Sequence, residues 1–174
     1  RPHCVEYAWH HFVADSPITQ YPARAPFWPL GEVYFAAQKI DEWPGENYDG
    51  TSVRAGAKIL RNLGFISEFR WAFTVQDIIT TILTVSPVVM GTNWYDDMFY
   101  PDAKGHIKVG GGIAGGHAYL LDGVNTNTGF FRIKNSWGRN WGKNGYAYIS
   151  IQDISRLLAE YGEAAIAIEV NKSA

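Results

Sequence analysis

Three residues far apart in this sequence, Cys4, His117 and Asn135, could together perform acyl chemistry. A thiolate is a strong nucleophile, and an imidazole can carry its proton. An amide oxygen can accept a hydrogen bond from the ring and so fix which nitrogen stays free. The sequence contains a single cysteine, so no disulfide within it competes for the thiol. These residue types predict a site in which Cys4 attacks, His117 is the base and Asn135 orients the imidazole.

The segments around His117 and Asn135 have the pattern of a β-hairpin. Both are rich in β-branched and aromatic residues, and turn-forming residues at 125–129 separate them. If the turn centres on Thr126, His117 lies directly opposite Asn135 and both side chains point to the same face. Asp122 differs in parity from His117, so we expect it on the other face of its strand. The spacing therefore favours Asn135 as the partner of the imidazole.

The cysteine is expected at the beginning of a helix. Cys4, Ala8 and Phe12 recur at the spacing of one helix face, behind Pro2, and predict a helix over residues 4–14. The positive end of a helix dipole favours a thiolate, and the free N–H groups of the first turn can donate to an oxyanion. Nucleophile and electrophilic assistance would then share one location.

Other patterns divide the chain into a helical half and a strand-rich half. Further helices are predicted over 31–41, from a cap at Thr51 or Asp49 to Gly64, from a capping box of Thr74 and Asp77 to about residue 83, and over 153–161. Strands are predicted over 87–92, 117–124, 129–134, 146–151 and 164–170. The order predicts an α+β fold in a single domain, 1–174, with a helical lobe at about 1–85, a β-rich lobe at 86–174 and a groove between them.

Composition excludes several classes of partner. The chain of 174 residues carries a net charge of −2 and has no run of Lys or Arg, which argues against nucleic-acid and anionic-membrane binding. Its apolar stretches are too short to span a bilayer, and its first residues lack the layout of a signal peptide. With no disulfide to maintain, nothing requires an oxidising compartment; export is left undecided, and a cytoplasmic or a bacterial- or phage-associated location is favoured.

The hairpin closely resembles one signature of the papain-like, or cysteine cathepsin, peptidases. The matching residues are His117, Asn135-Ser136-Trp137-Gly138, Trp141-Gly142 and Gly145-Tyr146. The order Cys, His, Asn is also that family's order, and the resemblance extends from Cys4 to about Val170. It implies a papain-like fold, a peptide or protein substrate and no cofactor. The short spacing resembles compact members of bacterial or phage type, and the chain could be part of a longer polypeptide.

The resemblance also implies roles for supporting residues. Trp137 resembles the aromatic residue that shields the His–Asn hydrogen bond, and Trp141 would pack behind the hairpin. Gly50 and Thr51 resemble the segment that offers main chain to an extended substrate, and Gly116 would leave the passage beside the histidine open. Four further residues are considered for the walls of the substrate pocket: Tyr95, Phe99, Tyr100 and Ile113.

Two features depart from the family pattern. The family carries a glutamine a few residues before its cysteine, which donates to the oxyanion, and only Arg1, Pro2 and His3 precede Cys4 here. Val5 follows the cysteine where the family usually has tryptophan. His3 is expected to be exposed to solvent.

Three alternatives to a peptidase remain open. The same thiol could transfer an acyl group to an amine, or a degraded site could leave a peptide-binding module. A zinc site at Cys4, His106, His117 and an Asp is also conceivable, but it lacks the paired spacing of metal ligands, so no metal is expected.

Overall fold

The structure is a computed structural model that describes residues 2–15, 29 and 31–170. Its helices are α1 (Cys4–Ala14), α2 (Glu32–Gln38), α3 (Val53–Asn62), α4 (Val75–Thr84) and α5 (Ile151–Ala159), with a short 3-10 helix, η1 (Asp96–Phe99). Its strands are β1 (Ile66–Trp71), β2 (Val88–Tyr95), β3 (His106–Ile107), β4 (Ile113–Asn125), β5 (Phe130–Lys134), β6 (Tyr146–Ser150) and β7 (Glu163–Glu169). Every predicted helix and strand has a counterpart, whereas β1, β3 and η1 were not predicted.

The strands form one sheet in the order β1-β7-β2-β4-β5-β6-β3. Neighbouring strands run antiparallel except for β3 and β6, which are parallel. Strand β7 lies between β1 and β2, so the sheet joins segments from both halves of the chain. The α+β class is confirmed. In the described part of the chain, no helix has the length and apolar character needed to cross a membrane.

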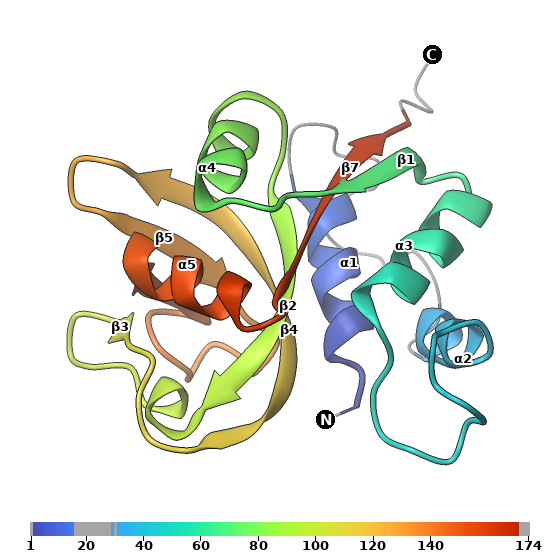
Figure 1. The fold of residues 1–174 in the computed structure, drawn as a ribbon, viewed down its shortest axis with the longest axis horizontal. Coiled ribbons are helices and arrows are strands. Elements are labelled where there is room, and N and C mark those ends of the chain that lie inside the picture. Colours follow the sequence, from blue (N-terminus) through green and yellow to red (C-terminus); the bar gives the residue numbers. More distant parts are fainter. Residues whose placement is uncertain (1, 16–28, 30, 171–174) are drawn as a thin grey trace.

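The central strands are buried on both faces, because successive side chains of a strand point to opposite sides. In β4, Ala118 and Leu120 pack in a core with α1, α2 and α3. Their neighbours Tyr119 and Leu121 pack in a second core with α4 and α5. Figure 1 shows these two groups of helices on opposite sides of β2 and β4. The two lobes therefore meet within the sheet, and the central strands contribute to both.

Helix α3 begins at a different cap from the one predicted. Ser52 is the N-cap, and its Oγ accepts a hydrogen bond from the N–H of Ala55 at 3.0 Å. The prediction that Thr51 or Asp49 caps this helix is wrong. The hydroxyl of Thr51 instead donates to Oδ2 of Asp41 at 2.8 Å, so this residue holds the preceding loop.

The predicted end of α3 and the predicted start of α4 are confirmed, whereas α2 ends at Gln38 rather than near residue 41, and α5 begins at Ile151 and ends at Ala159 rather than covering 153–161. Gly64 follows the C-cap of α3 with a φ of +80°, a left-handed conformation that glycine adopts without steric strain. At the start of α4, Thr74 and Asp77 form the predicted capping box. The Thr74 hydroxyl accepts from the Asp77 N–H, and the Asp77 carboxylate accepts from the Thr74 N–H, both at 3.1 Å.

The predicted register of the β4–β5 hairpin is wrong by three residues next to the turn, where Asn125 pairs with Phe130, and by two residues beyond the bulge. The prediction would pair Leu120 with Arg132, whereas the structure pairs Leu120 with Lys134. The shift of three arises at the turn, and the bulge reduces it by one. The side chain of Asn125 accepts from the N–H groups two and three residues later, at 3.0 and 3.1 Å, and so stabilises a longer loop than one centred on Thr126.

As a result, His117 and Asn135 do not face each other across the hairpin ladder. The strand neighbour of His117 is Thr92 of β2, and Asn135 follows the last residue of β5. Asp122 lies where a bulge interrupts the pairing, and both of its oxygens accept from Arg132, at 2.9 and 3.0 Å. The aspartate is therefore engaged elsewhere, and Asn135 must reach the imidazole from beyond the strand end.

Candidate active site

Cys4 is the first residue of α1, as predicted, and it is partly exposed. Helix α1 is fixed by its apolar face, where Trp9 is fully buried and its Nε1 donates to the carbonyl of Val53 on α3 at 3.2 Å. Gly56 lets the two helices approach, since a Cβ there would lie 2.6 Å from Cδ1 of Trp9. This packing holds the thiol at the positive end of the helix dipole.

The imidazole of His117 is oriented by Asn135. Nε2 of His117 lies 2.8 Å from Oδ1 of Asn135. The same oxygen accepts from the N–H of Ser136, also at 2.8 Å. Because a main-chain N–H can only donate, this contact determines which end of the amide faces the ring. His117 therefore donates through Nε2, and its Nδ1 keeps the lone pair that a general base requires.

Aromatic rings enclose this hydrogen bond. Trp137 stacks on His117 with the centroids 4.7 Å apart, and Trp94 meets the imidazole edge-on at 4.8 Å. Phe99 in turn stacks on Trp137 at 5.3 Å. Trp141 contacts Trp137 at 5.4 Å and donates from Nε1 to the carbonyl of Phe99 at 3.0 Å. The geometry of Trp137 and Trp141 fits shielding and support, and Trp94 adds a second shield that the sequence did not suggest.

This enclosure changes the acidity of the histidine. The His117 side chain is 8% exposed, and burial lowers its pKa from 6.5 to about 4, while the hydrogen bond to Asn135 partly offsets that effect. At neutral pH the ring is therefore uncharged unless an adjacent anion stabilises the imidazolium. The thiolate of Cys4 would be such an anion.

Cys4 and His117 line one groove with a volume of about 820 Å³. The other predicted substrate-binding residues are on its walls: Gly50, Thr51 and Gly116. Asn135 does not line the groove but lies behind the imidazole with Trp137. The structure thus brings the predicted nucleophile, the predicted base and the expected substrate contacts to one groove.

Gly50 is held firmly at the edge of this groove. Its φ of +101° is in the left-handed region that favours glycine. Its N–H donates to the hydroxyl of Tyr34 at 3.3 Å, and its carbonyl accepts from Nε2 of Gln38 at 3.1 Å. The carbonyl keeps a second lone pair for a ligand. Gly116 is open, because a Cβ there would meet no atom within 4 Å.

Cys4 and His117 share the groove without a hydrogen bond between them. Within the described residues, no hydrogen bond joins either ring nitrogen of His117 to the Cys4 Sγ. Catalytic hydrogen bonds are often long in unliganded enzymes and shorten when a substrate binds. The arrangement provides a free Nδ1 and a free thiol on the same groove, which is the minimum that nucleophilic catalysis requires.

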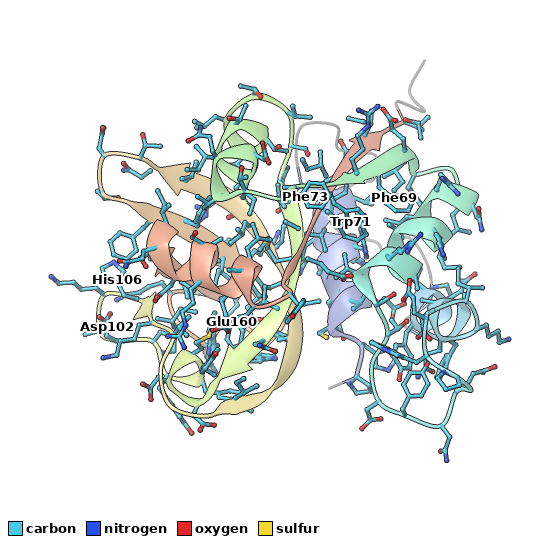
Figure 2. All side chains as sticks on the ribbon, in the orientation of Figure 1. Phe69, Trp71, Phe73, Asp102, His106 and Glu160 are labelled. Carbon is cyan, nitrogen blue, oxygen red and sulfur yellow. The ribbon has the colours of Figure 1, made fainter. Side chains whose placement is uncertain are left out.

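Carboxylates dominate the charge of the groove. Four line it, Glu42, Asp49, Glu160 and Glu163, with Arg54 as the cation among the described lining residues. Glu160, labelled in Figure 2, accepts from the hydroxyl of Tyr95 and from Arg156. Burial and the nearby charge of Glu42 raise the pKa of Glu163. The groove therefore presents a negative surface to a ligand.

Several residues considered from the sequence lie outside the groove. His106 is beside Asp102, and Figure 2 shows this pair at the β3 edge, far from the beginning of α1. The structure therefore does not bring His106 to Cys4 and His117. In the ranges described, no cluster of three or more His, Cys, Asp or Glu side chains could hold a metal ion.

The residues considered for pocket walls also lie elsewhere. None of these four residues is among those that line this groove: Tyr95, Phe99, Tyr100 and Ile113. The prediction for His3 is wrong. Its Nδ1 is 3.0 Å from Oε2 of Glu6, and its side chain is 23% exposed, so it is a partly buried, paired residue.

The fold and the groove together define a papain-like class of protein. A solved structure of xylellain, a cysteine protease from Xylella fastidiosa, superposes with a TM-score of 0.75 over 97% of this chain and 80% of that one, at 22% identity. The family model described as papain family cysteine protease matches residues 46–169. The chain belongs to this family. The matched span contains His117 and Asn135 but not Cys4.

Two curated relatives illustrate the range of the family. Cathepsin B-like cysteine proteinase 5 of Caenorhabditis elegans is 32% identical over 74 residues, which cover 41% of this chain and 22% of the relative. An uncharacterized peptidase C1-like protein of Acanthamoeba polyphaga mimivirus is 30% identical over 108 residues, or 59% of this chain and 34% of the relative. The chain thus matches about a fifth to a third of the length of these relatives.

Proposed function

We propose that this protein is a cysteine peptidase in which Cys4 is the nucleophile, His117 the general base and acid, and Asn135 the residue that orients the imidazole. The observation that carries the proposal is the 2.8 Å contact from His117 Nε2 to Asn135 Oδ1, in a groove that Cys4 also lines. That contact leaves Nδ1 of His117 free on the side where a base is needed. A groove that only bound peptides would have no physical need for this combination of thiol, imidazole and amide.

The first half of the reaction forms a thioester. The proton of the Cys4 thiol passes to Nδ1 of His117, and the thiolate attacks the carbonyl carbon of a peptide bond. The N–H groups of the first turn of α1 face the developing oxyanion, where the helix dipole adds to their effect. The C–N bond then breaks, and His117 gives the proton from Nδ1 to the departing amine.

The second half releases the acid. Water takes the place of the amine, His117 accepts one of its protons at Nδ1, and the oxygen attacks the thioester carbonyl. The C–S bond breaks, and the proton returns to the sulfur. Throughout, Asn135 keeps the ring in one tautomer, while Trp137 and Trp94 exclude water that would compete for the hydrogen bond between the imidazole and the amide.

The test is intact-mass analysis after treatment with a peptidyl epoxide, which alkylates activated thiols, at neutral pH. We expect rapid single labelling of Cys4 in the wild type and a loss of at least tenfold in labelling rate in His117→Ala. His106→Ala is the matched control, because it removes a histidine remote from the groove and should label like the wild type. Slow labelling in both the wild type and His117→Ala would contradict the proposal and favour a peptide-binding module.

Turnover separates hydrolysis from acyl transfer. A quenched fluorescent peptide incubated with the wild type should give products with a free carboxylate, identified by mass. If the acyl group appears only on an added amine and water does not compete, the protein is an acyltransferase that uses the same thiol.

A further inference from the structure

Glu6, two residues after Cys4, is a carboxylate buried within the protein. Its side chain is 1% exposed, although it lies in the first turn of α1. Both of its oxygens accept from the N–H of Gly31, at 3.0 and 2.9 Å, and Oε1 also accepts from the N–H of Val33 at 3.2 Å. A buried charge of this kind persists only where hydrogen bonds replace its water. The partners here are the main-chain donors at the beginning of α2.

His3 strengthens the same connection from the other side of the cysteine. Its Nδ1 contacts Oε2 of Glu6 at 3.0 Å. Its ring lies against Tyr34 and Phe35 of α2, with centroid distances of 4.3 and 6.1 Å. The residue before the nucleophile and the residue two positions after it are therefore both attached to α2.

The same helix also holds the edge of the groove. Gln38, which is 5% exposed, donates to the carbonyls of Tyr48 and Gly50 at 2.8 and 3.1 Å. The hydroxyl of Tyr34 accepts from the N–H of Gly50 at 3.3 Å. The segment before Gly50 contains no helix or strand, so these bonds to α2 replace the ladder of hydrogen bonds that would otherwise fix it.

We infer that Glu6 is a positioning residue, and that α2 is a rigid link which sets the distance between the thiol of Cys4 and the groove edge at Gly50. The inference rests on the proposed function, since it concerns where a bound peptide lies relative to the nucleophile. An extended ligand must contact the groove edge and reach the sulfur at the same time. A small shift of the groove edge relative to the sulfur would misalign the bound peptide for attack by the thiolate. Such a shift would not change the chemistry of the thiol itself.

This division of roles predicts a specific pattern of reactivity. Alkylation of Cys4 by iodoacetamide depends on the thiol, the helix dipole and His117, because the reagent is too small to use the groove edge. Labelling by a peptidyl epoxide depends in addition on the groove edge. A change that disturbs only the connection through α2 should therefore slow labelling by the peptidyl epoxide and leave alkylation by iodoacetamide unchanged.

The experiment measures both alkylation rates by intact mass in Glu6→Gln and in Tyr34→Phe. We expect the peptidyl epoxide rate to fall about tenfold in Glu6→Gln and about threefold to tenfold in Tyr34→Phe, which loses only the hydroxyl that contacts Gly50. The iodoacetamide rate should stay within about twofold of the wild type. Glu32→Gln is the matched control, because Glu32 is an exposed carboxylate in the same first turn of α2 and should leave both rates unchanged.

The outcomes are distinguishable. If both rates fall together in a folded variant, or if neither falls, Glu6 and α2 do not position the groove edge and the inference is overturned. Should Glu6→Gln fail to fold, Tyr34→Phe decides alone, since it retains the buried carboxylate. If the wild type itself reacts with the epoxide no faster than free cysteine does, the proposed function fails, and this inference fails with it.

Discussion

The low pKa of His117 makes a quantitative prediction about stability. The perturbation is Cys4→Ser, which removes the thiolate that could hold an imidazolium, so that burial becomes the dominant influence on the acidity of the ring. The pKa of His117 is then about 4 in the folded state, compared with 6.5 in the unfolded chain. Between these values the unfolded chain binds the proton and the folded protein does not, so stability is lost as the pH falls from 6.5 towards 4.

The magnitude follows from the size of the shift. At about 1.4 kcal/mol per pKa unit, the full effect is about 3 kcal/mol, and about 2 kcal/mol of it develops between pH 7 and pH 5. Burial also lowers the pKa of His11, to about 3, so the total pH dependence contains more than one histidine. The contribution of His117 to the pH dependence is therefore obtained by comparing two variants that differ only at this residue.

The assay is urea unfolding of Cys4→Ser and of the double variant Cys4→Ser/His117→Gln, followed by tryptophan fluorescence at several pH values. We expect the double variant to lose about 2 kcal/mol less free energy of unfolding than Cys4→Ser between pH 7 and pH 5, whatever its absolute stability. If the two variants lose the same amount, the imidazole does not titrate as a buried group, and the explanation of its acidity by enclosure is refuted.

Three further perturbations test other parts of the site. Asn135→Ala leaves the ring N–H of His117 without its acceptor and should lower kcat/KM for a fluorogenic peptide by about 10- to 100-fold; a change below twofold would contradict the orienting role. In the Cys4→Ser background, Trp137→Ala admits water to the imidazole, so the pKa of His117 should rise from about 4 towards 6.5, and an unchanged midpoint in an NMR titration would argue against shielding. Gly56→Ala should cost about 1–3 kcal/mol in urea unfolding, since its Cβ would lie 2.6 Å from the α1 tryptophan; Gly123→Ala, whose Cβ has ordinary contacts, should change stability less.

The fold was largely predictable because its signals are local. The capping box at Thr74, the glycine after α3 and the alternating strands all act over a few residues, and each was confirmed. The hairpin register was not predictable from the turn residues alone, because the side chain of Asn125 selects a longer loop. Strand β1 was missed because it lies at the sheet edge and has few buried residues, which weakens its pattern.

Site residues could be predicted where the chemistry of the residue type alone suggests a role. They could not be predicted where the role depends on contacts between segments that are distant in the sequence. Cys4 and His117 were identified by what a thiol and an imidazole can do. A glutamate on a helix is usually solvated, so nothing near Glu6 in the sequence indicates that its partners are main-chain groups 25 residues away. The contact of Trp94 with His117 could not be predicted for a similar reason, because aromatic residues are common in buried strands whether or not they lie beside a site.

The position of β7 between β1 and β2 has a consequence for biosynthesis. Strand β1 has β7 as its sheet neighbour, yet about a hundred residues separate them along the chain, so this pairing gives the fold a high contact order. A ribosome must release Glu163–Glu169 before the sheet can close. Glu163 also lines the groove, so the substrate-binding surface is completed only at that late stage. Between the synthesis of His117 and that of Glu163–Glu169, a nascent chain therefore contains both its thiol and its imidazole without the complete surface that would present a peptide to them.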